Sequence, residues 1–118
     1  MATPIPVDIK VHTRSRIFEI AFEDGIRGEL THEFLRVHSP SAEVRGHGPG
    51  QEMLQLDKES VTIDSVEPVG NYAVKLHFSD GHNTGIYTWE LLYDMARNRD
   101  RLWGDYLARC AAAGHPRA

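Results

Sequence analysis

The chain has 118 residues, a length typical of one domain, and a formal net charge of −4 with histidine neutral. This acidic balance argues against a general nucleic-acid binder and against a protein that binds anionic membranes, because both need a basic surface. A single cysteine, Cys110, excludes an intrachain disulfide and any zinc site that takes two or more cysteine ligands from this chain.

The localisation expected from the sequence is the cytoplasm. The first residues lack the basic and apolar regions of a signal peptide, and no apolar run approaches the length of a membrane span.

The first third of the chain predicts two strands, a tight turn and a short helix. Apolar and polar residues alternate over 8–13 and again over 16–22, as in strands with one buried face. Asp24-Gly25 follows directly, and Asp-Gly is a strong turn signal because glycine takes a positive φ without steric cost. Thr31 is placed to cap a short helix that extends to residue 36.

Residues 39–51 have a different character. They contain three glycines and two prolines, which predicts irregular structure. A loop of this length inside a compact domain is often functional. Its glycines follow neither the P-loop nor the dinucleotide-binding pattern, so we interpret residues 46–50 as a recognition loop rather than a nucleotide site.

The strand pattern returns over 61–66 and 72–78, and a second Asp-Gly turn follows at Asp80-Gly81. A helix is expected from Thr88 to Gly114, with a break at 98–100.

The apolar stripe of this helix carries three residues with two interpretations each. Cys110 is interpreted as a small core residue rather than a nucleophile. Trp103 and Tyr106 are interpreted as core, and as markers of a partner surface if they prove exposed.

The sequence Phe-x-Asp-Gly occurs twice, as Phe22-Glu23-Asp24-Gly25 and as Phe78-Ser79-Asp80-Gly81. An alternating segment precedes each copy and a helical segment follows it, which indicates an internal repeat. The predicted fold class is therefore α+β, with two ββα repeats that form a small, mostly antiparallel sheet with helices, plus a C-terminal helix.

Residues 78–92, together with 28–36 and 39–43, resemble the gamma-butyrobetaine hydroxylase-like N-terminal domain family. The resemblance implies one domain over 1–118, with a core at about 8–95 and a helical extension at 96–114. Small bacterial members consist of this domain alone. In larger eukaryotic enzymes similar to it, the domain precedes an iron- and 2-oxoglutarate-dependent oxygenase domain. Residues 96–118 are too few to form such a domain, so we expect the resemblance to imply the fold and no hydroxylase activity.

In those larger enzymes the domain carries a zinc ion held by three cysteines and one histidine. The resemblance places that histidine at His82, and the cysteine positions at Ser39, Ser41 and Val44, so that all three thiolate ligands are missing. The alternative is a replacement site of His38, His47 and His82, which would take Zn, Fe or Ni. If His82 is not a metal ligand, we interpret it as a turn histidine that forms a hydrogen bond with a backbone carbonyl.

No residue is assigned to catalysis. Asp24 and Asp80 could form a carboxylate pair, but two Asp-Gly turns account for them, because each aspartate accepts the amide hydrogen bonds of its own turn. Ser39 and Ser41 lack the Gly-x-Ser-x-Gly context of a nucleophile.

The sequence favours a non-catalytic cytoplasmic adaptor or binding domain that binds a protein partner or a small ligand. The resemblance connects it to iron, iron–sulfur or redox metabolism, because some similar domains are attached to nucleotide-dependent scaffold proteins of that pathway. The expected binding residues lie in the loop and the second turn: Arg45, Gly46, His47, Gly48, Gly50, Asp80 and Gly81. A homodimer through an edge strand is a further option. The alternatives are a metal-binding protein anchored by His82, with Zn or Fe, and an enzyme of unrecognised class.

Overall fold

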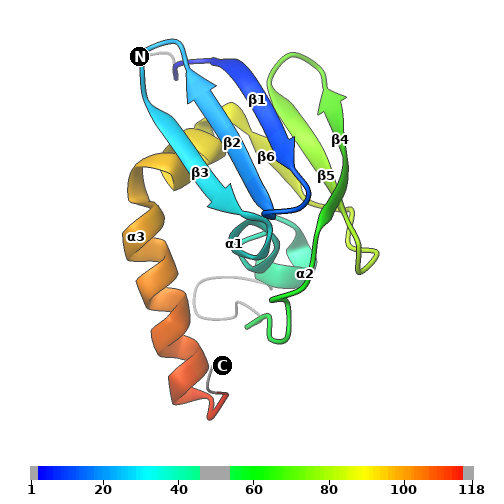
Figure 1. The fold of residues 1–118 in the computed structure, drawn as a ribbon, viewed down its shortest axis with the longest axis vertical. Helices are drawn as coiled ribbons and strands as arrows, with labels where there is room; N and C mark the ends of the chain where they lie inside the picture. The colour runs from blue at the N-terminus through cyan, green and yellow to red at the C-terminus, as the bar shows by residue number, and fades with distance from the viewer. Residues whose placement is uncertain (1–2, 46–53, 116–118) are drawn as a thin grey trace.

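The computed structural model describes residues 3–45 and 54–115, which form an α+β fold of two three-stranded antiparallel sheets and helices (Figure 1). The first sheet has the order β1-β2-β3 and leads into a short helix. Its elements are β1 (Pro6–His12), β2 (Ile17–Phe22), β3 (Arg27–Thr31) and α1 (His32–Val37).

The second sheet has the order β4-β5-β6 and leads into the long C-terminal helix. A four-residue helix, α2, precedes it. The elements of this half are α2 (Ala42–Arg45), β4 (Ile63–Val69), β5 (Ala73–Phe78), β6 (Ile86–Thr88) and α3 (Trp89–Ala112).

The two Asp-Gly turns have the same geometry. Gly25 and Gly81 adopt φ values of +91° and +89°, in the region that glycine alone enters easily. The Asp24 carboxylate accepts a hydrogen bond from the amide of Ile26 at 3.0 Å, and Asp80 accepts one from the amide of His82 at 3.2 Å. These bonds confirm that each aspartate serves its own turn.

The helix caps are also alike in the two halves. The Thr31 hydroxyl accepts the amide of Phe34 at 2.9 Å, and the Thr88 hydroxyl accepts the amide of Leu91 at 3.1 Å. Each cap satisfies an amide that the first turn of its helix would otherwise leave unpaired.

The structure confirms the α+β class and adds a third strand to each half, between the turn and the helix. The strands divide into two sheets instead of one, because β3 and β6 each complete a separate antiparallel ladder. The expectation of irregular structure throughout 39–51 is wrong at Ala42–Arg45, which forms α2.

One apolar core lies between the two sheets and the helices. Phe18 and Ile20 of β2 and Leu76 of β5 are fully buried in it, together with Leu92 of α3. Since residues of both sheets fill one cluster, neither half buries its apolar face by itself.

Helix α3 lies along β3 and then extends beyond the sheet (Figure 1). A Cβ atom on Gly28 of β3 would lie 2.8 Å from the Cβ of Ala96, so glycine permits this close approach. The helix is broken at Asn98, with φ −117° and ψ 19°, where the sequence predicts a break. No helix in 3–45 or 54–115 is long and apolar enough to cross a membrane.

Beyond the break, α3 forms a second, smaller core with α1. Tyr106 and Cys110 are buried there with Val37, which confirms the interpretation of both as core residues. The Trp103 ring stacks on Tyr106 with a centroid distance of 5.2 Å and is only partly exposed.

Candidate functional site

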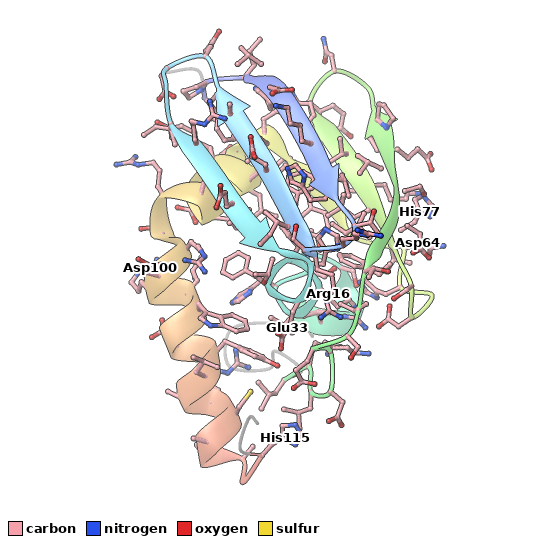
Figure 2. The ribbon with its side chains drawn as sticks, in the orientation of Figure 1. Arg16, Glu33, Asp64, His77, Asp100 and His115 are labelled. Atoms are coloured by element: carbon pink, nitrogen blue, oxygen red, sulfur yellow. The ribbon has the colours of Figure 1, made fainter. Side chains whose placement is uncertain are left out.

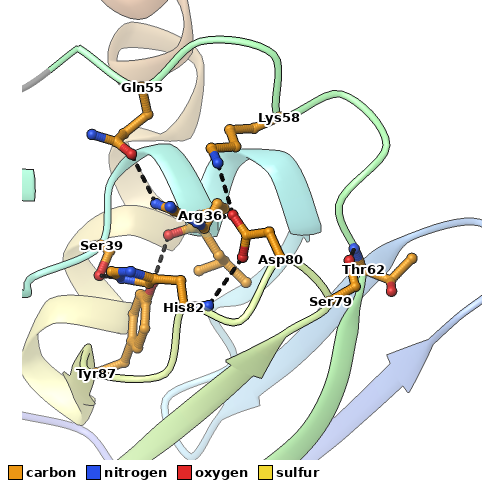
Figure 3. Close-up of polar contacts among 10 residues, drawn as sticks. Arg36, Ser39, Gln55, Lys58, Thr62, Ser79, Asp80, His82 and Tyr87 are labelled. Carbon is orange, nitrogen blue, oxygen red and sulfur yellow. Dashed lines mark hydrogen bonds and ion pairs between the residues drawn. The ribbon is translucent and has the colours of Figure 1, made fainter.

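The second Asp-Gly turn meets α1 and the segment before β4 in a cluster of charged side chains (Figure 3). Arg36, in the last turn of α1, donates through Nε to Asp80 Oδ2 at 2.8 Å. Lys58 donates through Nζ to the same oxygen at 2.8 Å. Arg36 also donates to the side-chain oxygen of Gln55 at 3.1 Å, so the cluster joins three separate segments.

The cluster is largely enclosed. The Arg36 side chain is 8% exposed and that of Asp80 is 25% exposed. Burial raises the pKa of the Asp80 carboxyl, but hydrogen bonds from Lys58, the His82 amide and Arg36 outweigh it and lower the pKa from 3.8 to about 2. Because the folded-state pKa is lowered, the stabilisation is present above pH 3.8 and is lost as the pH falls towards 2.

Beside this cluster, Ser39 and His82 form a buried polar pair (Figure 3). Ser39 Oγ lies 2.8 Å from His82 Nε2 and also accepts the amide of Ser41 at 3.3 Å. A Cβ atom on Gly85 would lie 2.5 Å from Ser39 Oγ, so glycine leaves the space that the pair occupies. The pair fixes the chain after α1 against the second turn.

The fold buries the four positions that the resemblance assigns to a zinc site and brings two of them into contact. Ser39, Ser41, Val44 and His82 are all buried, and Ser39 contacts His82 directly. The residues do not fit that ion: the Ser39 hydroxyl already bonds the histidine nitrogen, hydroxyl groups are poor zinc ligands, and valine supplies no ligand. The hydrogen bond between Ser39 and His82 lies at the position where the resemblance implies a metal ion.

The histidines of the alternative metal site have different surroundings. His38 Nδ1 lies 2.9 Å from the carbonyl oxygen of Phe34, and its ring packs against Phe34 and Tyr106. Burial lowers the pKa of His38. His47 lies outside the described residues. Within 3–45 and 54–115, no group of three or more His, Cys, Asp or Glu residues is placed to hold a metal ion. The three-histidine site stays a prediction.

A hollow of about 280 Å³ opens next to the charged cluster. It is lined by the segment before β4 and by the second turn: Asp57, Lys58, Ser60, Val61, Ser79 and Asp80. Of the expected binding residues, Asp80 belongs to this hollow and Gly81 forms the turn. Arg45 ends α2, and Gly46, His47, Gly48 and Gly50 lie outside the described residues.

Sequence reasoning does not find Arg36 and Lys58. A basic residue in the last turn of a helix is usually solvated, and Lys58 stands in a stretch without periodicity. Only the fold shows that both residues reach Asp80.

The comparisons place this geometry among known folds. The family model "Gamma-butyrobetaine hydroxylase-like, N-terminal" matches residues 9–93. A protein with an NMR solution structure is 46% identical to this chain, over 98% of this chain and 91% of that protein, with a TM-score of 0.84. A second protein with an NMR solution structure is 50% identical, over 98% of this chain and 86% of that protein, with a TM-score of 0.82. The crystal structure of a protein of unknown function from Acidithiobacillus ferrooxidans, of the DUF971 family, is 44% identical over 77% of this chain and 91% of that protein, with a TM-score of 0.65. A comparison with curated proteins gave no match.

Proposed function

We propose that this chain, which belongs to the gamma-butyrobetaine hydroxylase-like N-terminal family, is a non-catalytic cytoplasmic binding domain. It holds a protein partner at the hollow beside its second Asp-Gly turn. The observation that carries the proposal is the carboxylate oxygen of Asp80 that Arg36 and Lys58 share at the wall of that hollow.

The turn itself does not require this cluster. At the equivalent turn of the first half, Asp24 accepts the same backbone bond, and its side-chain donor among the described residues is the Tyr93 hydroxyl, at 2.6 Å. The two cations around Asp80 therefore serve another purpose. They attach α1 and the segment before β4 to a rigid turn, and rigid support of a lining segment is what a binding site needs.

The enclosure of the Ser39–His82 pair favours binding over nucleophilic catalysis. A serine beside a histidine resembles a nucleophile with its base. Ser39 is 1% exposed and His82 is 7% exposed, so the hydroxyl is shielded from a substrate. The Ser39 hydroxyl also accepts a backbone amide, which fits a structural role.

The lining of the hollow suggests the chemistry of the partner. Asp57 is strongly exposed and Lys58 is partly exposed, so both signs of charge stand at the opening with the hydroxyls of Ser60 and Ser79. A polypeptide segment with polar and charged side chains of both signs complements such a surface better than a ligand of one charge does. A place in iron, iron–sulfur or redox metabolism is supported by the family resemblance alone.

Site-specific photo-crosslinking tests the proposal. A photoreactive residue replaces Ser60 at the hollow, and in a control protein it replaces Ala108, which is exposed on α3. We expect one protein adduct from position 60 in cells and none of that mass from position 108.

The yield of the adduct should fall with Lys58→Gln. It should be unchanged with Lys10→Gln, which removes the same charge from the exposed β1 strand. Circular dichroism checks that both variants are folded. Identical adducts from both positions, or an adduct from position 60 that is insensitive to Lys58, would overturn the assignment of the site.

A further inference from the structure

A second hollow, of about 490 Å³, lies between β3 and the break in α3. Four arginines line it: Arg27 from β3, and Arg97, Arg99 and Arg101 from the helix. Among the described residues of the lining, only Glu29 and Asp100 supply carboxylates. This hollow is therefore locally positive on a chain whose net charge is −4.

The break in α3 gathers these arginines. In a regular helix, residues two apart point in directions about 200° apart, so Arg99 would lie on the face opposite to Arg97 and Arg101. Asn98 leaves the helical conformation, and its side-chain amide donates to the backbone and the carboxylate of Asp94 at 3.0 and 2.9 Å. As a result, all three arginines line the same hollow.

The contact between Gly28 and Ala96 brings the fourth arginine to the same place. The separation of 2.8 Å between the position of a Cβ at Gly28 and the Cβ of Ala96 shows how closely α3 approaches β3. Arg27, the neighbour of Gly28 on the strand, consequently lines the hollow together with the helical arginines.

The ion pairs of Arg99 and Arg101 are exposed on both sides, so a ligand can displace them, whereas Glu19 in the Arg27 pair is only 21% exposed. Arg27 contacts Glu19 at 3.0 Å, Arg99 contacts Asp100 at 2.9 Å, and Arg101 contacts Asp105 at 3.8 Å. Asp100 is 92% exposed and lies on α3 at the outside of the molecule (Figure 2). Exposed pairs of this kind contribute little to stability.

The Arg97 guanidinium lies over the ring of Tyr93, 5.7 Å from its centroid. The quadrupole of an aromatic ring attracts a cation above its face, and oxyanions bind to the N–H groups of a guanidinium. The Tyr93 ring therefore helps to hold Arg97 beside the hollow.

We infer that this hollow binds a small oxyanion that carries two or more negative charges on phosphate or carboxylate groups. Guanidinium groups present forked N–H donors that match both kinds of oxygen. The volume is that of a small-molecule site, and the positive lining selects a multivalent anion. This site is separate from the hollow at Asp80, and the inference does not depend on the proposed protein partner.

Calorimetric titration with pyrophosphate and, separately, with citrate tests the inference. We expect saturable binding of one ion per chain. The double variant Arg27→Gln/Arg99→Gln should weaken it by about tenfold or more, because two charge-assisted contacts are lost. Tighter binding of pyrophosphate identifies phosphate as the ligand chemistry, and tighter binding of citrate identifies carboxylate.

The matched control is Arg14→Gln/Arg109→Gln, which removes the same charge from two exposed arginines outside the hollow. Its affinity should stay close to that of the wild type. If the two double variants weaken binding equally, the attraction is diffuse and the site is wrong. Absence of saturable binding of either anion would also overturn it.

Discussion

At the scale of single residues, His32 is a fully buried side chain whose charge state depends on pH. Its Nδ1 accepts the backbone amide of Ile63 at 3.0 Å, which joins the start of α1 to β4. Only a neutral imidazole can accept this bond. Burial lowers the pKa of His32 below 6.5, and the nearby charges of Arg16 and His12 act in the same direction.

We predict that the protein loses stability as the pH falls below about 6.5, the ordinary pKa of histidine. The unfolded chain then binds a proton that folded His32 resists, so protonation favours unfolding. Urea unfolding between pH 8 and 5 measures the slope of the unfolding free energy against pH. This slope should be smaller in His32→Gln than in the wild type. His38, whose pKa is also lowered, should keep the slope above zero. A slope in His32→Gln equal to that of the wild type would contradict the prediction.

Two glycines provide a matched pair for a second prediction. A methyl group at Gly85 would meet Ser39 Oγ at 2.5 Å and the Tyr87 ring at 3.2 Å, whereas nothing lies within 4 Å of one at Gly104. Gly85→Ala should destabilise the fold by about 1–3 kcal/mol through overpacking. Gly104→Ala in α3 should stabilise it by about 0.5–1 kcal/mol through helix propensity. Thermal denaturation separates the two, and a neutral Gly85→Ala would show that the Ser39–His82 pair is not tightly packed.

At the scale of elements, local patterns predict the turns, the caps and the long strands. Alternation and Asp-Gly suffice for β2 and β5, and Thr31, Thr88 and Asn98 carry signals that the structure follows. The short strand β6 has three residues, too few to show a period of two. Helix α2 escapes prediction because the glycines and prolines around it dominate the composition of its segment.

The sites depend on contacts between distant segments, which no local pattern encodes. Ser39 and His82 are brought together by packing, and only the family resemblance points to both. Arg27 joins the arginines of α3 because Gly28 admits the helix, a close approach that a lone glycine in a strand does not reveal. The basic residues near the C-terminus are visible in the sequence, but their convergence on one hollow is not.

The segment between α1 and α2 supports a gain-of-metal prediction. The triple variant Ser39→Cys/Ser41→Cys/Val44→Cys restores the ligand types that the resemblance implies, next to His82 in a site that is already buried. We expect the reduced protein to bind about one zinc ion per chain, because three thiolates and one imidazole complete a tetrahedral site. Elemental analysis and the visible spectrum of the Co²⁺ form measure this.

The wild type and the triple variant with His82→Gln are the references for that experiment. Loss of tight metal binding on His82→Gln would locate the ion at the restored site. A triple variant that binds no more metal than the wild type would show that the backbone around Ser39 and Ser41 differs from that of a zinc site.

At the scale of the whole molecule, the two halves are joined by buried bonds as well as by a common core. The Tyr87 hydroxyl on β6 donates to the carbonyl oxygen of Leu35 in α1 at 2.6 Å, and Tyr87 is fully buried. His32 makes the reciprocal connection to β4. Each half therefore satisfies a buried polar group of the other, which couples the two halves.

We therefore predict that the molecule unfolds in one cooperative transition. Trp89 begins α3 beside the second sheet, and its indole donates to the carbonyl oxygen of Asn71 at 2.8 Å. Trp103 instead packs against Phe34 of α1, with ring centroids 6.3 Å apart.

Variants that retain one tryptophan each report on different regions, and their fluorescence midpoints in urea should coincide with that of circular dichroism. Tyr87→Phe should lower every midpoint together, by a free energy of about 1–2 kcal/mol, because it leaves the Leu35 carbonyl without its buried donor. A Trp103 signal that changed at lower urea than the Trp89 signal would mean that α1 and the end of α3 unfold separately, and that the shared core lies within the sheets alone.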